Sequence, residues 1–204
     1  MTDIIGVGYL FKHLLFEFPF TTEKIVFENN YIDGFTAKNM NQKSQVIVHS
    51  YEGVDNFMVR LATKNPRDEM FLIKCSKQMK PEEAVARVQK KKKAAMPLER
   101  HDIFKMPKVS VNQMRNVTEM IGVKLNNDNF KEYAFSKFYE IVKLDIDEKG
   151  AKVENIGVIA ATKGKISRPA NIKEIILNKP FWVVMRESES APYFVSYIKV
   201  PVEK

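Results

Sequence analysis

NKPFWVVMRESESAPYFVSYIKV, residues 178–200, is the stretch that decides the fold. It contains two apolar runs, Phe181–Met185 and Tyr193–Val200, on either side of the polar segment Arg186–Ser190. Apolar runs of strand length separated by a short polar turn are typical of a β-hairpin. We therefore predict that the chain closes with two antiparallel strands.

Three apolar runs in the first half of the chain also have the length of strands. They are Val46–His49, Phe57–Leu61 and Met70–Cys75, and turn-forming residues stand between the first two. This spacing predicts antiparallel strands joined by hairpins. Ile103–Val109 is a further strand candidate, which Pro107 restricts to a sheet edge or a bulge.

The longest strand signal is Tyr133–Ile146. The opening segment, Ile4–Phe20, is apolar on both sides, as expected for a strand buried on two faces, and Pro19 ends it. Asp147–Asn171 is polar and contains glycine. Because loops of this length are uncommon in compact domains, we expect this one to be functional or disordered.

Two helices are also predicted. One begins at Pro81 and has Lys90–Lys93 near its C-terminal end, where positive charge complements the helix dipole. The other is Asn112–Gly122, with apolar residues at helical spacing and a final glycine. Together these elements predict one domain over residues 1–204, a strand-rich α+β fold with mostly antiparallel sheets and two or three short helices.

The composition excludes several classes of protein. The net charge of +8 comes from 33 basic and 25 acidic residues that are spread along the chain, without the aromatic and basic pattern of an RNA-binding sheet. No apolar stretch approaches the roughly 20 residues that a membrane span requires. The N-terminus does not have the pattern of a signal peptide, and Cys75 is a single cysteine. We expect a cytoplasmic protein, and secretion stays open.

The closing hairpin and the strand before the long loop resemble the serpin family. Asn178–Arg186 is similar to the family's Pro-Phe hairpin at the C-terminus. Phe135–Gly150, which begins with Phe-Ser-Lys and ends with Glu-Lys-Gly, is similar to the strand that leads into the serpin reactive loop. These two segments carry the resemblance.

Weaker similarities extend it toward the N-terminus. Phe104–Lys108 resembles the family's Leu-Pro-Lys-Phe strand, and Asn112–Gly122 resembles the short helix that follows it. Tyr9–Lys12 with Phe18–Phe20 resembles a strand of the central sheet. The resemblance implies the C-terminal half of the serpin fold, a truncated form without the first helices and strands.

The resemblance also implies a mechanism, in which a cleaved reactive loop inserts into the central sheet and traps the protease. Insertion needs small side chains at alternate hinge positions. Here Val153 and Asn155 take two of these inward positions. Burying an unpartnered amide costs about 1–3 kcal/mol, and overpacking costs a similar amount. The predicted hinge residues, which argue against inhibition, are Glu148, Gly150, Ala151, Val153, Asn155 and Gly157.

Two groups of basic residues are candidate contact sites. Lys163, Lys165 and Arg168 lie where a serpin presents its cleavage site. Any exposed loop with lysines is sensitive to trypsin, so cleavage there does not identify an inhibitor. Lys90, Lys91, Lys92 and Lys93 could bind an anion, but their match to the helix dipole favours a solvated helix end.

Other chemistry is not indicated by the sequence. The three histidines have no cysteine or carboxylate at ligand spacing, so we expect no metal and no cofactor. No catalytic constellation stands out, and we do not expect an enzyme. The high content of lysine, isoleucine and asparagine is typical of A/T-rich genomes, such as those of some viruses.

Two functions remain open. The first is a non-inhibitory, serpin-derived binding or structural protein that acts through protein–protein contacts of an exposed sheet. Bare sheet surface is an apolar patch, so we expect a homo-oligomer or a protein partner to cover it. The second is a serine protease inhibitor or decoy that uses the loop 151–169 against a trypsin-like protease.

Overall fold

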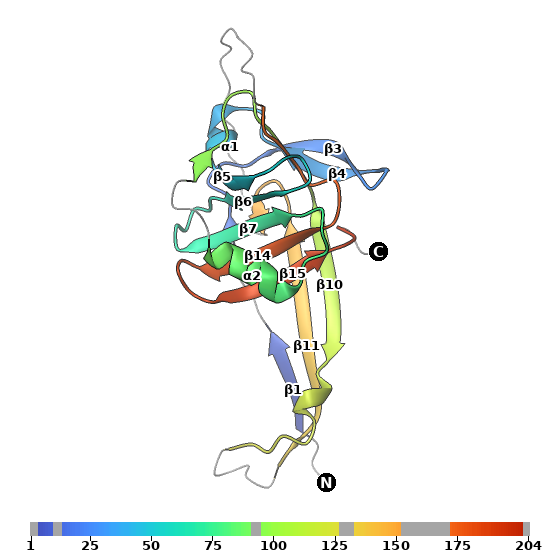
Figure 1. The fold of residues 1–204 in the computed structure, drawn as a ribbon. Helices are drawn as coiled ribbons and strands as arrows, with labels where there is room; N and C mark the ends of the chain where they lie inside the picture. Colours follow the sequence, from blue (N-terminus) through green and yellow to red (C-terminus); the bar gives the residue numbers. More distant parts are fainter. Residues whose placement is uncertain (1–3, 10–13, 91–94, 127–132, 152–171, 202–204) are drawn as a thin grey trace.

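The computed structural model describes residues 4–9, 14–90, 95–126, 133–151 and 172–201. Strands make up most of it, with two α-helices and one 3-10 turn. Figure 1 shows an elongated molecule, with a body formed by two larger sheets and a three-stranded sheet that reaches well beyond this body. The chain therefore has two regions: the packed body, and the part of the three-stranded sheet that extends beyond it.

The largest sheet has six strands in the order β15-β14-β7-β6-β5-β8, and all neighbours are antiparallel. It confirms the predicted closing hairpin and the three predicted strands in the first half of the chain. In chain order its strands are β5 (Val46–Tyr51), β6 (Phe57–Leu61), β7 (Asp68–Lys74), β8 (Met96–Pro97), β14 (Phe181–Glu187) and β15 (Pro192–Ile198).

Helix α2 (Pro81–Gln89) contacts β14 and β15 of this sheet. The helix is the one predicted from Pro81, and its buried side chains are Ala84 and Val88. They pack with Phe71 and Trp182 in a small apolar cluster. The predicted apolar stripe of this helix is therefore what attaches it to the sheet.

The second sheet has four strands in the order β13-β9-β4-β3. β9 (Ile103–Pro107) was predicted as a strand, but its predicted place at an edge or bulge was wrong, because it lies between β13 and β4 with Pro107 as its last residue. β3 (Thr21–Phe27) and β4 (Asn30–Thr36) were not predicted. β3 and β4 form a hairpin whose turn residues, Glu28 and Asn29, have φ angles of 44° and 74°. β13 (Glu174–Ile176) pairs with β9 in parallel. Figure 1 shows the β3–β4 hairpin projecting from the body.

Helix α1 (Met40–Ser44) follows this hairpin and was also not predicted. A capping box starts it: the Asn39 side chain accepts from the Gln42 backbone N–H, and the Gln42 side chain accepts from the Asn39 backbone N–H. This reciprocal pair satisfies two N–H groups that a helix start leaves open.

The third sheet has the order β1-β11-β10, with β1 (Ile4–Tyr9), β10 (Val109–Asn116) and β11 (Phe135–Ile146). β1 pairs with β11 in parallel, and β10 pairs with β11 in antiparallel orientation. A separate two-stranded pair joins β2 (Leu14–Leu15) to β12 (Gly150–Ala151). Most strand pairs are thus antiparallel, as predicted.

Two predicted elements were wrong. The single opening strand Ile4–Phe20 is divided into β1 and β2, and an irregular segment follows β2. The predicted helix Asn112–Gly122 is strand β10 up to Asn116, followed by the 3-10 turn η1 (Thr118–Met120). The strand prevails because β10 pairs continuously with β11 from Val109 to Asn116, and this ladder satisfies its backbone groups.

The main core lies between the two larger sheets and the body end of the three-stranded sheet. Its largest fully buried side chains include Phe16, Phe35, Phe57, Phe104 and Phe181. Because each aromatic side chain buries a large apolar area, these residues contribute strongly to the stability of the body.

Candidate functional site

The predicted hinge begins with a tight turn between β11 and β12. The Asp147 N–H donates to the carbonyl oxygen of Gly150 at 2.9 Å, and the Gly150 N–H donates back to the Asp147 carbonyl at 3.3 Å. The Asp147 carboxylate accepts from the Lys149 N–H at 2.8 Å and from the Gly150 N–H at 3.2 Å. The aspartate side chain therefore fixes the turn from inside.

Glycine is required at position 150 for two reasons. Its backbone φ of +141° is one that residues with a Cβ rarely adopt. A Cβ there would also overlap the carbonyl oxygen of Leu14 and would come within 2.8 Å of the Leu15 Cα. The close approach exists because Gly150–Ala151 pairs with Leu15–Leu14 in antiparallel orientation. The first residues of the predicted hinge are therefore held against β2.

The segment after β2 closes around the same turn. The Phe16 N–H donates to the Lys149 carbonyl at 2.9 Å, and the Phe20 N–H donates to the Glu148 carbonyl at 2.7 Å. The two phenyl rings are buried and meet edge to face at 5.1 Å, and the Phe20 ring lies 5.1 Å from that of Phe104. The turn is thus attached to the aromatic core of the body.

An ion pair links the turn to the start of β10. The Lys108 Nζ lies 2.7 Å from a carboxylate oxygen of Glu148. Burial raises the pKa of Glu148, but the hydrogen bond from Lys108 and its positive charge outweigh this effect, so the net pKa is lower than usual. Glu148 was predicted as a hinge residue, whereas Lys108 was not linked to it.

Two buried glutamines hold the segment that follows. The Gln42 Nε2 donates to the Pro19 carbonyl at 2.7 Å, and its Oε1 accepts from the Lys38 N–H at 2.8 Å. The Gln45 side chain donates to the Phe18 carbonyl at 2.6 Å and accepts from the Phe18 N–H at 2.9 Å. Their amides therefore substitute for the strand pairing that this irregular segment lacks.

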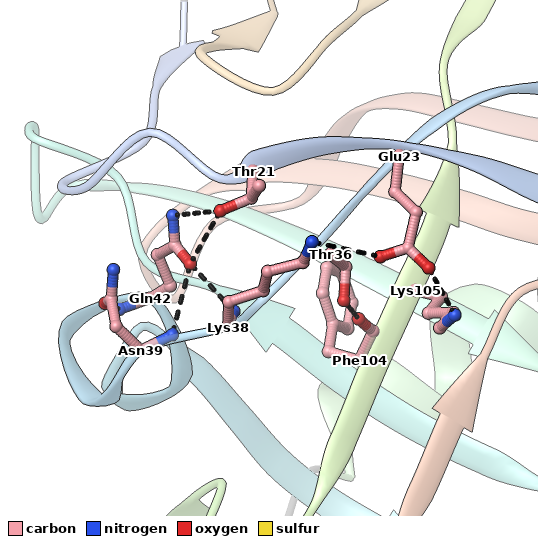
Figure 2. A network of polar contacts seen from close by, with 8 residues as sticks. All are labelled: Thr21, Glu23, Thr36, Lys38, Asn39, Gln42, Phe104 and Lys105. Carbon is pink, nitrogen blue, oxygen red and sulfur yellow. Dashed lines mark hydrogen bonds and ion pairs between the residues drawn. The ribbon is translucent and has the colours of Figure 1, made fainter. Parts of the chain in front are cut away.

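Figure 2 shows how these contacts continue into the second sheet. Gln42 also contacts the hydroxyl of Thr21, and the Thr36 hydroxyl donates to the Phe104 carbonyl at 2.8 Å. Glu23 accepts from Lys105 at 2.6 Å, and this hydrogen bond is the main reason why the pKa of Glu23 is lowered. α1, β3 and β9 are thereby tied together by side chains.

A second anchor lies at the start of the described segment 172–201. The buried Asp102 carboxylate accepts from the Lys173 N–H at 2.8 Å and from the Glu99 N–H at 2.9 Å. Ile175 and Leu177 are fully buried beside β9. The segment 152–171 is therefore bounded by fixed backbone on both sides.

A buried lysine reinforces this second anchor. Lys74 is 2% exposed, and its Nζ donates to the carbonyls of Val54 and Ile176, both at 2.9 Å, and to the Asn178 Oδ1 at 2.6 Å. The Asp55 carboxylate lies 2.9 Å away. Burial lowers the pKa of Lys74, and Asp55 opposes this effect. One ammonium group thus joins β7, the β5–β6 turn and the segment after β13.

The predicted site residues divide into those that the structure describes and those outside the described residues. Glu148, Gly150 and Ala151 lie together at the turn. Lys90 is exposed at the end of α2. The remaining predictions fall outside the described residues: Val153, Asn155, Gly157, Lys163, Lys165, Arg168, Lys91, Lys92 and Lys93. They stay predictions.

Lys90 borders a hollow of about 520 Å³ between α2 and strands β5 and β6. Its lining includes Arg87, whose guanidinium donates to the Ser50 hydroxyl at 3.2 Å and to Asn56 at 3.1 Å. Glu52 and Glu83 line it as well. Because both signs of charge are present, the predicted anion site is not reinforced by its surroundings.

The anchoring residues were the ones that sequence reasoning missed. Gln42, Gln45, Lys74, Asp102 and Lys108 are polar residues next to apolar strands, and their partners lie far away in the chain. One local signal existed, because Asn39 and Gln42 have the spacing of a capping box. The other contacts depend on tertiary structure.

Within the described residues, no group of three or more metal-ligating side chains gathers at one point. None of the described helices is long and apolar enough to cross a membrane.

The exposed part of the three-stranded sheet is the second candidate site. Near its free end, Ile121, Val123 and Tyr133 are 45%, 43% and 37% exposed. The Val123 carbonyl accepts from the Phe135 N–H, which places these residues beside the start of β11. Neither α1 nor α2 lies against this part of the sheet (Figure 1). Three partly exposed apolar side chains therefore lie in the connection between β10 and β11.

Comparisons with known proteins identify the fold. No family model and no curated protein sequence matches the chain. Among solved structures, it is similar to a serpin from the trematode Schistosoma haematobium (TM-score 0.65, 14% identity), and the match covers 97% of this chain and 56% of that one. It is also similar to the mouse protein-Z dependent protease inhibitor (TM-score 0.64, 15% identity, 95% and 54% coverage).

A third similar structure is thyroxine-binding globulin in complex with thyroxine (TM-score 0.64, 11% identity, 100% and 59% coverage). The chain thus spans between 54% and 59% of the length of these three serpin-fold chains. The described residues adopt part of the serpin fold, which confirms the resemblance seen in the sequence. One of these proteins is named as an inhibitor and another as a ligand-binding protein, so the fold alone does not assign a function.

Proposed function

We propose that this chain is a non-inhibitory binding or structural protein, not an enzyme, that makes protein–protein contacts through its exposed three-stranded sheet. The observation that carries the proposal is the group of exposed apolar residues at the free end of this sheet: Ile121, Val123 and Tyr133. Contiguous apolar surface on a soluble domain usually marks an interaction site. The partner or a second copy would bury it.

The predicted hinge composition supports the non-inhibitory part of the proposal. The first hinge residues are held against β2 by the pairing of Gly150–Ala151 with Leu15–Leu14. Loop insertion beyond this point would have to accommodate Val153 and Asn155 at inward positions. The penalties for an unpartnered amide and for overpacking would slow insertion, and a trap works only when insertion outpaces deacylation.

The alternative is a protease inhibitor or decoy that uses the loop 151–169. The similarity to the mouse protein-Z dependent protease inhibitor favours it, as does the basic character of Lys163, Lys165 and Arg168. The two functions differ in what happens after cleavage. An inhibitor keeps the protease covalently bound, whereas a binding protein is cut and released.

Incubation with trypsin at equimolar ratio, followed by denaturing electrophoresis and assay of the remaining protease activity, separates the two functions. We expect cleavage of the chain, no SDS-stable complex and full trypsin activity. The control is Gly150→Pro, with folding verified by circular dichroism, because proline cannot adopt the φ of +141° at the turn. An SDS-stable complex that Gly150→Pro abolishes would refute the non-inhibitory proposal.

A further inference from the structure

Edge strands expose a row of backbone N–H and C=O groups that can pair with another strand. Native proteins protect such edges with charged residues, proline, bulges or covering segments. The edges of the two larger sheets follow this rule. Their edge strands contain these protecting residues: Glu23 and Lys24 in β3, Glu174 in β13, Pro97 in β8 and Pro192 in β15.

β1 is an edge strand without protecting charges or proline. It lies at the end of the order β1-β11-β10, and in the described part of the chain only β11 pairs with it. Its sequence, IIGVGY, contains no charged residue and no proline over six residues. The register with β11 shifts once, between Ile4 and Ile5, and the ladder then continues from Ile5 to Tyr9 without a further shift. These five residues form a regular, uncharged edge that is suited to accept another strand.

The other edge of the same sheet differs. β10 contains Arg115, and the Ser110 N–H donates to the Pro201 carbonyl at 2.7 Å. The chain therefore covers part of the β10 edge with its own C-terminal segment. Strand addition to this sheet is accordingly favoured at β1.

We propose that β1 pairs with the β1 strand of a second copy of this chain. The pairing rests on the proposed function, since it names the partner of the exposed sheet. A closed dimer of identical chains has a two-fold axis, and a two-fold axis perpendicular to the sheet makes the two β1 strands antiparallel. The two sheets then become one sheet of six strands, in the order β10-β11-β1-β1-β11-β10.

Charge is the reason to name a second copy as the occupant. β1 has no charged group with which to select an acidic or a basic strand. Pairing with an identical strand places no like charges opposite each other, although each chain carries a net charge of +8. The long-range repulsion between the two chains is screened by salt. Dimerisation is therefore strengthened as ionic strength rises, whereas binding of an acidic partner would be weakened.

This pairing also brings the apolar end of each sheet close to the other copy. Ile4 pairs with Phe135, whose N–H donates to the Val123 carbonyl, so the start of β1 lies at the apolar end. In an antiparallel pair, the apolar end of each copy comes beside the Tyr9 end of the other copy's β1. The exposed Ile121 and Val123 are then available for contacts along the joint sheet.

Light scattering coupled to size-exclusion chromatography tests the pairing. We expect the wild-type chain to elute with twice the mass of its 23.6 kDa monomer, and the dissociation constant to fall between 50 mM and 500 mM salt. A monomer at about 100 μM would overturn the inference, as would a dimer that salt weakens. The salt series distinguishes self-pairing from electrostatic recognition.

Charge variants at the centre of β1 test the location. Val7→Lys alone and Val7→Glu alone should each raise the dissociation constant at least tenfold, because like charges then meet near the two-fold axis. An equimolar mixture of the two should restore the dimer. The matched control is Val26→Lys on the β3 edge, where Val26 is 42% exposed, and it should leave the mass unchanged. Circular dichroism of each variant verifies folding.

The possible failures are distinguishable. A wild-type dimer that Val7→Lys leaves intact, or a mixture that stays monomeric, would overturn pairing through β1. A monomeric wild type that forms no SDS-stable complex with trypsin would overturn this inference and leave the proposed function standing. An SDS-stable complex abolished by Gly150→Pro would instead refute the proposed function.

Discussion

β11 passes through two different environments within one strand. At its C-terminal end, Leu144 and Ile146 are 5% and 1% exposed, and they lie opposite Val111 and Val109, which are buried as well. At its N-terminal end, Phe135 and Phe138 are only half-buried, and Ile121 and Val123 nearby face solvent. Both ends of β11 are paired, the N-terminal end with β1 and the C-terminal end with β10. The difference is that the core of the body packs against the C-terminal end of β11, whereas the side chains near its N-terminal end are partly exposed.

This difference separates two roles of apolar residues. At the body end they stabilise the fold of the single chain, because they are buried in the main core next to the turn between β11 and β12. At the free end the same residue types contribute little until another surface covers them. We therefore expect substitutions at the body end to change the free energy of unfolding, and substitutions at the free end to change association.

The largest effect should come from truncating the aromatic core. Phe104→Ala removes a fully buried ring that contacts Phe20 and Phe35, and should cost about 3–5 kcal/mol of unfolding free energy. Ile121→Ala, at a residue 45% exposed, should change it by no more than about 0.5 kcal/mol. Urea denaturation at one fixed protein concentration measures both. Equal losses would contradict the division between the two ends.

An intermediate effect is expected at the turn that joins β11 to β12. Gly150→Ala places a residue with a Cβ at a positive φ, which should lower the free energy of unfolding by about 1–3 kcal/mol. The added Cβ also overlaps Leu14, which should lower it by about as much again. Gly53→Ala is the control, since its φ is +124° and nothing lies within 4 Å of the added Cβ. The difference between the two unfolding free energies measures the close approach of β2. Identical losses would argue against that approach.

The smallest effect concerns the Glu148–Lys108 ion pair. The folded-state pKa of Glu148 is lowered, so its ionisation stabilises the fold at every pH above the pKa of an unfolded glutamate, about 4.3. This contribution, at most about 1 kcal/mol, should be lost as the pH falls through the folded-state pKa. Thermal unfolding of wild type and Glu148→Gln from pH 7 to pH 3 should show the two converging. Persistence of the same pH dependence in Lys108→Met would contradict the pairing.

The elements that were predicted correctly are those in which several local sequence signals indicate the same secondary structure. The closing hairpin, β5, β6, β7, α2 and β11 were found because alternation, turn residues and helix-end charges all indicate the same structure. The β3–β4 hairpin was missed although Glu28 and Asn29 occupy its turn, since its strands mix charged and apolar residues. Asn29 was a turn signal that could have been used.

The wrong helix has a physical explanation. The apolar residues Met114, Val117 and Ile121 fit a helical period, yet Val109 and Val111 continue an alternation that fits a strand. The neighbouring strand β11 decides between them, and a local pattern does not contain it. The same limit applies to the anchors. The contacts of Lys74 with Ile176 and Asn178 join residues from distant parts of the chain, and only the folded structure brings them together.

The parallel pairing of Ile4 with Phe135 has a consequence for biosynthesis. β1 leaves the ribosome before its neighbour β11, because residues 10–134 separate the two strands in the chain. Contacts between such distant segments form slowly, because a long loop must close before they contribute energy. During this delay an uncharged strand is exposed to other nascent chains, so we expect production of this protein to depend on chaperones that shield β1.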